Sequence, residues 1–160
     1  MNAGQLLHLS LVIHIIGLAT VGGSNLVAFV MQGQFWKQYA LDKGKGVAIM
    51  SATSRIPMIT MMGVLLLILS GVSMMAITHG VFGEQFWFRV KIAVLVVIII
   101  NGITFGRRSN ATLKKLIIED TNGNDMTSEL ESSRKQIRIF YFIQLSLLIT
   151  IFVLSIFKFN

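Results

Sequence analysis

Four long runs of apolar residues, separated by shorter polar connections, dominate the pattern along the chain. The runs cover approximately residues 5–31, 56–78, 86–105 and 139–157, which is more than half of the 160 residues. Each run is close to the roughly 20 residues that an α-helix needs to cross the hydrocarbon core of a bilayer. The sequence therefore predicts an all-α integral membrane protein, a four-helix bundle in which residues 1–160 form a single transmembrane domain.

The composition supports this interpretation and excludes several other classes of protein. Hydrophobic residues make up 54% of the chain and charged residues 13%, whereas charged residues are about a quarter of an ordinary soluble domain. A cytosolic enzyme, a secreted disulfide scaffold and a disordered tail are therefore excluded. The chain has no cysteine, so any redox chemistry must come from a cofactor or a substrate.

The basic charge is best explained by the membrane rather than by nucleic acid. Lysine and arginine number 14 against 7 acidic residues, which gives a formal net charge of +7. Most of these cations flank the apolar runs, where they contact anionic lipid and set the topology. We expect the lipid bilayer as a partner, and no nucleic acid.

The charge distribution also predicts the orientation of the four spans. Eleven cations lie in the first and third connections: Lys37, Lys43, Lys45, Arg55, Arg107, Arg108, Lys114, Lys115, Arg134, Lys135 and Arg138. The N-terminal segment has no charged side chain, and the second connection has only Glu84. The positive-inside rule then places the first and third connections in the cytoplasm and both termini outside, in the cell (inner) membrane.

The third connection has the composition of a helical hairpin. Residues 111–120 favour a helix, residues 121–124 read TNGN as a turn, and Ser128 to Glu131 matches a capping box. We therefore expect spans three and four to extend into the cytoplasm as a helical hairpin. A calcium loop is the alternative for Asp120, Asn122, Asn124 and Glu131, although Asp125 stands where such a loop needs glycine. The DKGKG stretch from Asp42 to Gly46 is interpreted as a flexible loop.

The first span has one polar face, which we expect to point into the bundle. At 100° per residue this face carries Ser10, His14, Gly17, Ser24, Asn25, Ala28 and Gln32, and Val12, Ile16, Val27 and Val30 lie opposite. Gly22 and Gly23, like Gly63 and Gly71 in the second span, would let a helix or a flat ligand approach the backbone. Asn25, Asn101 and Gln144 stand at similar depth, and we expect them to hydrogen-bond one another. The nine methionines favour adaptable packing, with copper ligation as the alternative.

His14 and Lys91 are the candidate site residues. Both lie in the half of the bilayer nearer the termini, at similar depth. The structural interpretation is a neutral imidazole bonded across helices and an ammonium that reaches the interface. The functional interpretation is an imidazole that ligates haem iron or accepts a proton, and an ammonium that pairs with a propionate or polarises a quinone oxygen. We carry both interpretations forward.

Short motifs at and around these residues indicate a family. They are His14-Ile15-Ile16 with Gly22-Gly23, then Arg55 and Gly71, then Trp87, Lys91 and Gly106-Arg107-Arg108. Over roughly residues 5–110 the chain resembles the small membrane protoporphyrinogen oxidases of the HemJ type and, more loosely, CopD-like membrane domains. The resemblance implies a bundle that binds haem b and oxidises a porphyrinogen, with electrons passed to a membrane acceptor. It also implies that His14 and Lys91 are catalytic, that His14 ligates the metal, and that His14, Lys91 and Arg55 bind the cofactor.

Two positions depart from the family pattern and keep a second function class open. Ser24-Asn25-Leu26 replaces an aromatic and Leu-Pro-Arg run, and Asn101-Gly102 replaces a Tyr-His pair. The alternative is a non-catalytic membrane subunit or binding protein that works as a homo-oligomer or in a larger membrane complex. If the chain is instead a redox protein of the HemJ kind, the expected ligand is a porphyrin or a quinone.

The charge distribution generates the first prediction, which concerns topology. The chain has no native cysteine, so single cysteines can be labelled without background. Gly123→Cys should be protected from an impermeant thiol reagent in intact cells, because Gly123 lies in the basic third connection. Asn2→Cys should be labelled. The reverse labelling pattern would contradict the orientation.

Overall fold

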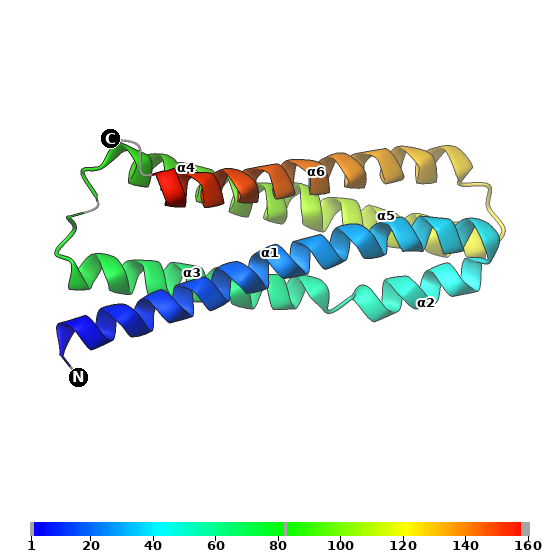
Figure 1. Cartoon of the computed structure of the whole chain (residues 1–160). Helices are drawn as coiled ribbons and strands as arrows, with labels where there is room; N and C mark the ends of the chain where they lie inside the picture. The colour runs from blue at the N-terminus through cyan, green and yellow to red at the C-terminus, as the bar shows by residue number, and fades with distance from the viewer. Residues whose placement is uncertain (1, 82, 158–160) are drawn as a thin grey trace.

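The computed structural model describes residues 2–81 and 83–157, and these are almost entirely helical (Figure 1). The elements are α1 (Ala3–Leu41), α2 (Lys43–Thr53), α3 (Ile56–Ile77), α4 (Phe86–Asn101), the π-helical turn η1 (Gly102–Gly106), α5 (Arg107–Thr121) and α6 (Thr127–Phe157). Four segments are long and apolar enough to cross a membrane: α1, α2 with α3, α4 through α5, and α6. The predicted all-α four-helix bundle is confirmed, and the described chain has the character of a multi-pass membrane protein.

The helices are arranged as two antiparallel hairpins that lie side by side. One hairpin joins α1 to α2 and α3, and the other joins α4, η1 and α5 to α6; α1 also runs along α6 (Figure 1). Both termini lie at one end of the bundle, and the α1–α2 and α5–α6 turns lie at the other. Although α3 and α4 are consecutive, they barely contact each other. The two hairpins are therefore joined mainly through α1 and α6.

The helices are longer than a bilayer requires. The 39 residues of α1 span about 58 Å at 1.5 Å per residue, against a hydrocarbon core of about 30 Å. At the end opposite the termini, residues 32–53 and 107–138 form a second set of four packed segments, which we call the basic bundle. The predicted helical extension of spans three and four is present. The first connection forms helices of matching length, which the sequence analysis did not predict.

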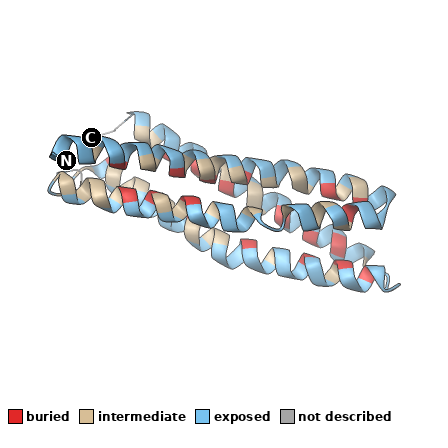
Figure 2. Cartoon of the chain, turned by 90° about the horizontal axis from the view of Figure 1, so that it is seen from below, coloured by how far each residue is buried: buried red, intermediate tan, exposed pale blue. Residues whose placement is uncertain are grey.

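The basic bundle has a hydrophobic core of its own. Its buried members are Phe35, Tyr39, Leu113, Ile117, Leu130 and Ile137. A separate, smaller core in the apolar half contains Val21, Leu67, Ile98, Leu148 and Ile151. Elsewhere exposed positions dominate, and buried positions form narrow stripes on the helices (Figure 2). Large apolar side chains on the outer faces are thus available to lipid.

A buried carboxylate ties the two turns of the basic bundle together. Asp120 accepts a hydrogen bond of 2.6 Å from the Tyr39 hydroxyl and pairs with the Lys43 ammonium at 2.8 Å. The Lys43 ammonium also donates to the Asp120 carbonyl oxygen at 3.0 Å. The hydrogen bond from Lys43, followed by that from Tyr39, holds the pKa of Asp120 below its usual range. The carboxylate is therefore charged at neutral pH and links α1 and α2 to α5.

The DKGKG stretch is ordered, so its interpretation as a flexible loop was wrong. The Asp42 carboxylate accepts hydrogen bonds from the backbone N–H groups of Gly44 and Lys45 and caps α2. Gly46 lies in the next turn, directly against Tyr39: a Cβ placed there would sit 2.6 Å from Tyr39 Cδ2 and 2.8 Å from its Cα. The missing side chain lets α2 fold back tightly onto α1.

The capping box predicted at Ser128 was also wrong. α6 already begins at Thr127. The backbone N–H of Thr127 donates a hydrogen bond to the Asp125 carboxylate at 3.1 Å. The Ser128 hydroxyl donates to Glu129 instead of accepting from the backbone. The calcium alternative gains no support, because Asp120 is engaged by Tyr39 and Lys43. Residues 2–81 and 83–157 contain no group of three acidic or histidine side chains suited to a metal ion.

The close approach at Gly46 generates a stability prediction. Gly46→Ala should destabilise the protein by about 1–3 kcal/mol, because the added methyl overlaps the backbone of Tyr39 and cannot be relieved by a rotamer change. Gly33→Ala is the matched control, since nothing lies within 4 Å of a Cβ at that position. Thermal unfolding, monitored by circular dichroism, should show a lower Tm for the Gly46→Ala variant and not for the Gly33→Ala variant. Equal Tm values for the two variants would contradict this packing.

Candidate functional site

A seam of small and hydroxyl-bearing residues joins α1 to α3 along the apolar half. Three side-chain pairs cross it in antiparallel register: Ser10 with Ser73 at 2.9 Å, His14 with Ser70 at 2.9 Å, and Ser24 with Thr60 at 2.8 Å. Between them the helices meet at Gly17 and Gly63. A Cβ at Gly63 would lie 2.8 Å from Val21 Cγ2, and one at Gly17 would lie 3.1 Å from the Gly63 carbonyl oxygen. Close backbone packing and hydroxyl pairs therefore hold this hairpin together.

The polar face predicted for the first span is confirmed. Every residue assigned to it is buried or half-buried, and the four aliphatic residues assigned to the opposite side are exposed. The glycine prediction is confirmed at Gly63. At Gly22 and Gly23, however, no atom lies within 4 Å of a Cβ, and at Gly71 the nearest is His14 Cε1 at an ordinary 3.8 Å.

The hydrogen bonds around His14 define which of its ring nitrogens is free. The Ser70 hydroxyl donates to the backbone carbonyl of Leu66, so its oxygen is left to accept. His14 Nδ1 therefore carries the hydrogen and donates to Ser70. The lone pair of the neutral ring is then on Nε2, to which no hydrogen bond is found within residues 2–81 and 83–157; the ring also interacts with the Leu67 backbone. Of the two ring nitrogens, Nε2 is therefore the one that this hydrogen bond leaves unoccupied.

Lys91 lies on the inward side of α4. Trp87 and Ile98, one turn before it and two turns after it, are buried, and Val94 and Leu95 pack against the apolar core. Lys91 itself is half-buried. Within the described ranges no carboxylate and no hydrogen-bond acceptor pairs with it. The structure thus places both His14 and Lys91 at half-buried positions, on α1 and α4.

The third proposed cofactor residue, Arg55, lies elsewhere. It precedes the first turn of α3, fifteen residues before Ser70, which corresponds to about 22 Å along the helix. The remaining histidines do not complete the site either, since His8 is exposed on α1 and His79 follows the end of α3. The described site therefore offers one imidazole and one ammonium.

The predicted layer of amides is present only in part. Asn101 Nδ2 donates to Gln144 Oε1 at 2.8 Å and joins α4 to α6. Asn25 instead donates to the Val21 carbonyl of its own helix. The copper alternative for the methionines gains no support, because Met58, Met61 and Met62 are exposed on α3.

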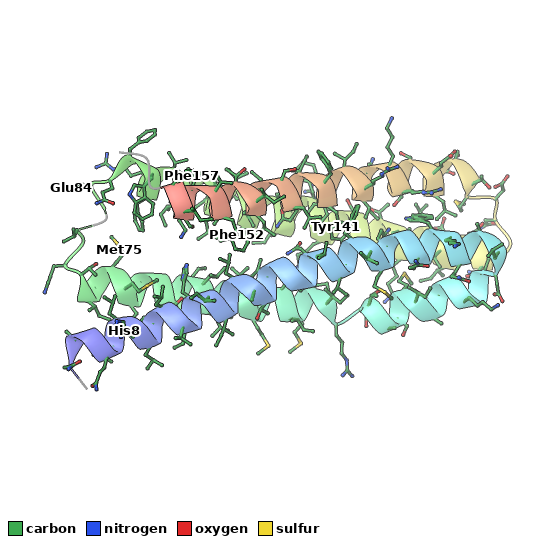
Figure 3. The ribbon with its side chains drawn as sticks, in the orientation of Figure 1. His8, Met75, Glu84, Tyr141, Phe152 and Phe157 are labelled. Atoms are coloured by element: carbon green, nitrogen blue, oxygen red, sulfur yellow. The ribbon has the colours of Figure 1, made fainter. Side chains whose placement is uncertain are left out.

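Two apolar grooves flank the open glycines of α1, a feature that the sequence analysis missed. The larger, about 410 Å³, lies between α1 and α6 and is lined by residues such as Leu18, Gly22, Leu26, Leu148 and Phe152. The smaller, about 240 Å³, lies between α1 and α3 beside Gly23 and Ile59. In Figure 3, Tyr141 and Phe152 lie on the side of α6 that faces α1. Leu18 follows His14 by one helical turn, so the larger groove begins next to the site.

Comparisons with protein-family models, with curated proteins and with solved structures found no match.

The seam next to His14 generates a cross-linking prediction. Ser10→Cys combined with Ser73→Cys should form a disulfide under mild oxidation, because the two hydroxyl oxygens are only 2.9 Å apart. Ser10→Cys with Val72→Cys is the control, since Val72 is 64% exposed on α3. A change in gel mobility that a reductant reverses measures the bond. Equal cross-linking of the two pairs would contradict the register of α1 against α3.

Proposed function

We propose that this protein binds a carboxylate-bearing tetrapyrrole between its two hairpins, in the half of the membrane nearer the termini. The observation that carries the proposal is Lys91, a half-buried ammonium that no described carboxylate neutralises, in the same half of the bundle as a histidine whose Nδ1 bonds Ser70 and leaves Nε2 for a ligand. A charged group at this depth is costly unless a partner compensates it. An anionic ligand with a coordinating centre satisfies both side chains at once.

In this arrangement His14 supplies the axial nitrogen and Lys91 pairs with a propionate. Ser70 acts as the positioning residue, because its hydroxyl fixes the imidazole through Nδ1. One imidazole suits a haem b with a single protein ligand, and bound haem would supply one-electron redox chemistry at this position. Arg55 has no part in the site, because it lies at the opposite end of α3.

The resemblance to HemJ-type proteins supports a redox activity on the same ligand class. We propose oxidation of a porphyrinogen, with its electrons passed to an acceptor in the membrane such as a quinone. The distribution of cations supports an inner-membrane location with both termini outside and the basic bundle in the cytoplasm.

A non-catalytic subunit of a larger membrane complex is the second candidate function. The sparse contact between α3 and α4 favours it, because the facing sides of these two helices are not packed against each other within this chain. The partner would have to supply the acid, since the four apolar spans of this chain contain no aspartate or glutamate.

The absorption spectrum of the full chain tests the tetrapyrrole proposal. Protein purified in mild detergent from haem-sufficient cells should show a Soret band, and His14→Ala should abolish it through loss of the iron ligand. Ser70→Ala should weaken haemin binding about tenfold, because the ring loses its orienting partner. Lys91→Met should release the pigment more readily during washing.

His8→Ala is the matched control, since His8 lies on the same helix but is exposed; it should retain the full band. Circular dichroism and gel filtration verify that each variant is folded. Wild-type protein that has no Soret band and binds neither added haemin nor protoporphyrin would reject the tetrapyrrole. A partner that co-purifies with wild type but not with Lys91→Met would then support the subunit function.

A further inference from the structure

Four exposed arginines lie at one level of the bundle, where the apolar helices meet the basic bundle. Arg55 can be placed by the register of the α1–α3 seam. Ser24 faces Thr60, and because the two helices are antiparallel, moving five residues along each brings Phe29 opposite Arg55. Arg55 is therefore level with Phe29 of α1.

The other three arginines reach this level from the second hairpin. Phe29 contacts Tyr141 edge to face, with ring centroids 6.4 Å apart, and Arg138 precedes Tyr141 by one turn of α6. A Cβ on Gly106 would lie 3.0 Å from the ring of Phe140, so Gly106 is level with this part of α6. Arg107 and Arg108 follow Gly106 directly. We call Arg55, Arg107, Arg108 and Arg138 the arginine ring.

The protein itself does not neutralise the arginine ring. All four side chains are exposed, and across residues 2–81 and 83–157 the ion pair found is Lys43 with Asp120. Six of the seven acids, Asp42, Glu119, Asp120, Asp125, Glu129 and Glu131, lie at or near the two turns at the far tip of the basic bundle. The seventh, Glu84, is in the α3–α4 connection. Four positive charges therefore lie at a level of the bundle that contains none of the seven acids.

We propose that the arginine ring binds the phosphates of anionic phospholipids. The arginine ring lies where the lipid-facing parts of the helices end and the basic bundle begins. This boundary corresponds to the depth of the lipid headgroups. Guanidinium groups hold phosphate oxygens through two parallel hydrogen bonds, which a lysine ammonium does not offer. The proposal concerns a different end of the molecule from His14 and does not depend on the tetrapyrrole.

The same helix provides a matched control for the ring. Lys114 and Lys115 on α5 are exposed, as are Arg107 and Arg108, and follow them by seven residues, or about 10 Å. If the ring is the binding surface, removing the two arginines should matter and removing the two lysines should not. If anionic lipid is attracted only by the net charge of the protein, removing the two arginines and removing the two lysines should weaken lipid binding equally.

Spin-labelled lipids measure this difference on the full chain in phosphatidylcholine vesicles. The immobilised fraction should show about a threefold preference of wild type for phosphatidylglycerol over phosphatidylcholine, and it should fall with added salt. R107Q/R108Q should at least halve the preference, and K114Q/K115Q should retain it. R138Q removes one arginine of the ring and should lower the preference for phosphatidylglycerol to a smaller extent. This single variant serves as the test if R107Q/R108Q does not fold.

Three results would overturn the proposal. The first is no preference for phosphatidylglycerol in wild type, and the second is an equal loss in the arginine and lysine variants. The third is a full preference in R107Q/R108Q and R138Q when both variants keep the wild-type circular dichroism spectrum.

Discussion

The hydrophobic effect acts on only one end of this bundle, and that end holds the two hairpins together. In the basic bundle, Phe35, Ile117, Ile137 and their neighbours leave water when they pack, which favours association strongly. In the apolar half the competing solvent is lipid, so packing against another helix gains no transfer free energy. Helices there associate only where small residues or polar pairs favour it, as along the α1–α3 seam.

This division leaves the two ends of the bundle joined to different degrees. The two hairpins pack against each other most firmly in the basic bundle. There the Asp120 carboxylate also links α1, α2 and α5 through its contacts with Tyr39 and Lys43. Towards the termini, α3 and α4 barely contact each other, and Lys91 and the His14 Nε2 are found in this part of the bundle. Among the described residues, polar groups without a hydrogen-bond partner are found in both halves, since Gln32 Nε2 and Trp36 Nε1 are buried without one in the basic bundle. The apolar half keeps its own small core around Val21, Leu67 and Ile98, so the sparse packing there is confined to the sides of α3 and α4 that face each other.

The features that could be predicted from sequence are those set by local solvent preference. The four spans and the inward face of the first span follow from apolar periodicity alone, and the similar depth of His14 and Lys91 follows from counting residues. The Tyr39–Asp120 contact could not be predicted, because its partners are 81 residues apart. The same holds for Gly46, whose role depends on the side chain that α1 presents. Ser128 matched a short motif, but Asp125 supplied the acceptor three residues earlier.

The irregular backbone of both hairpins lies at the level of the arginine ring. α2 and α3 are interrupted at Ser54 and Arg55, and η1 occupies Gly102–Gly106, opposite Phe140. Backbone groups freed by an interruption such as that between α2 and α3 are costly in hydrocarbon but can be satisfied by water or headgroups, whereas η1 keeps the second hairpin continuous as a π-helical turn. The broken helices and the unpaired guanidinium groups are thus independent features suited to the same depth. From there, the 22 residues of α3 extend about 33 Å at 1.5 Å per residue, the length that a bilayer core requires.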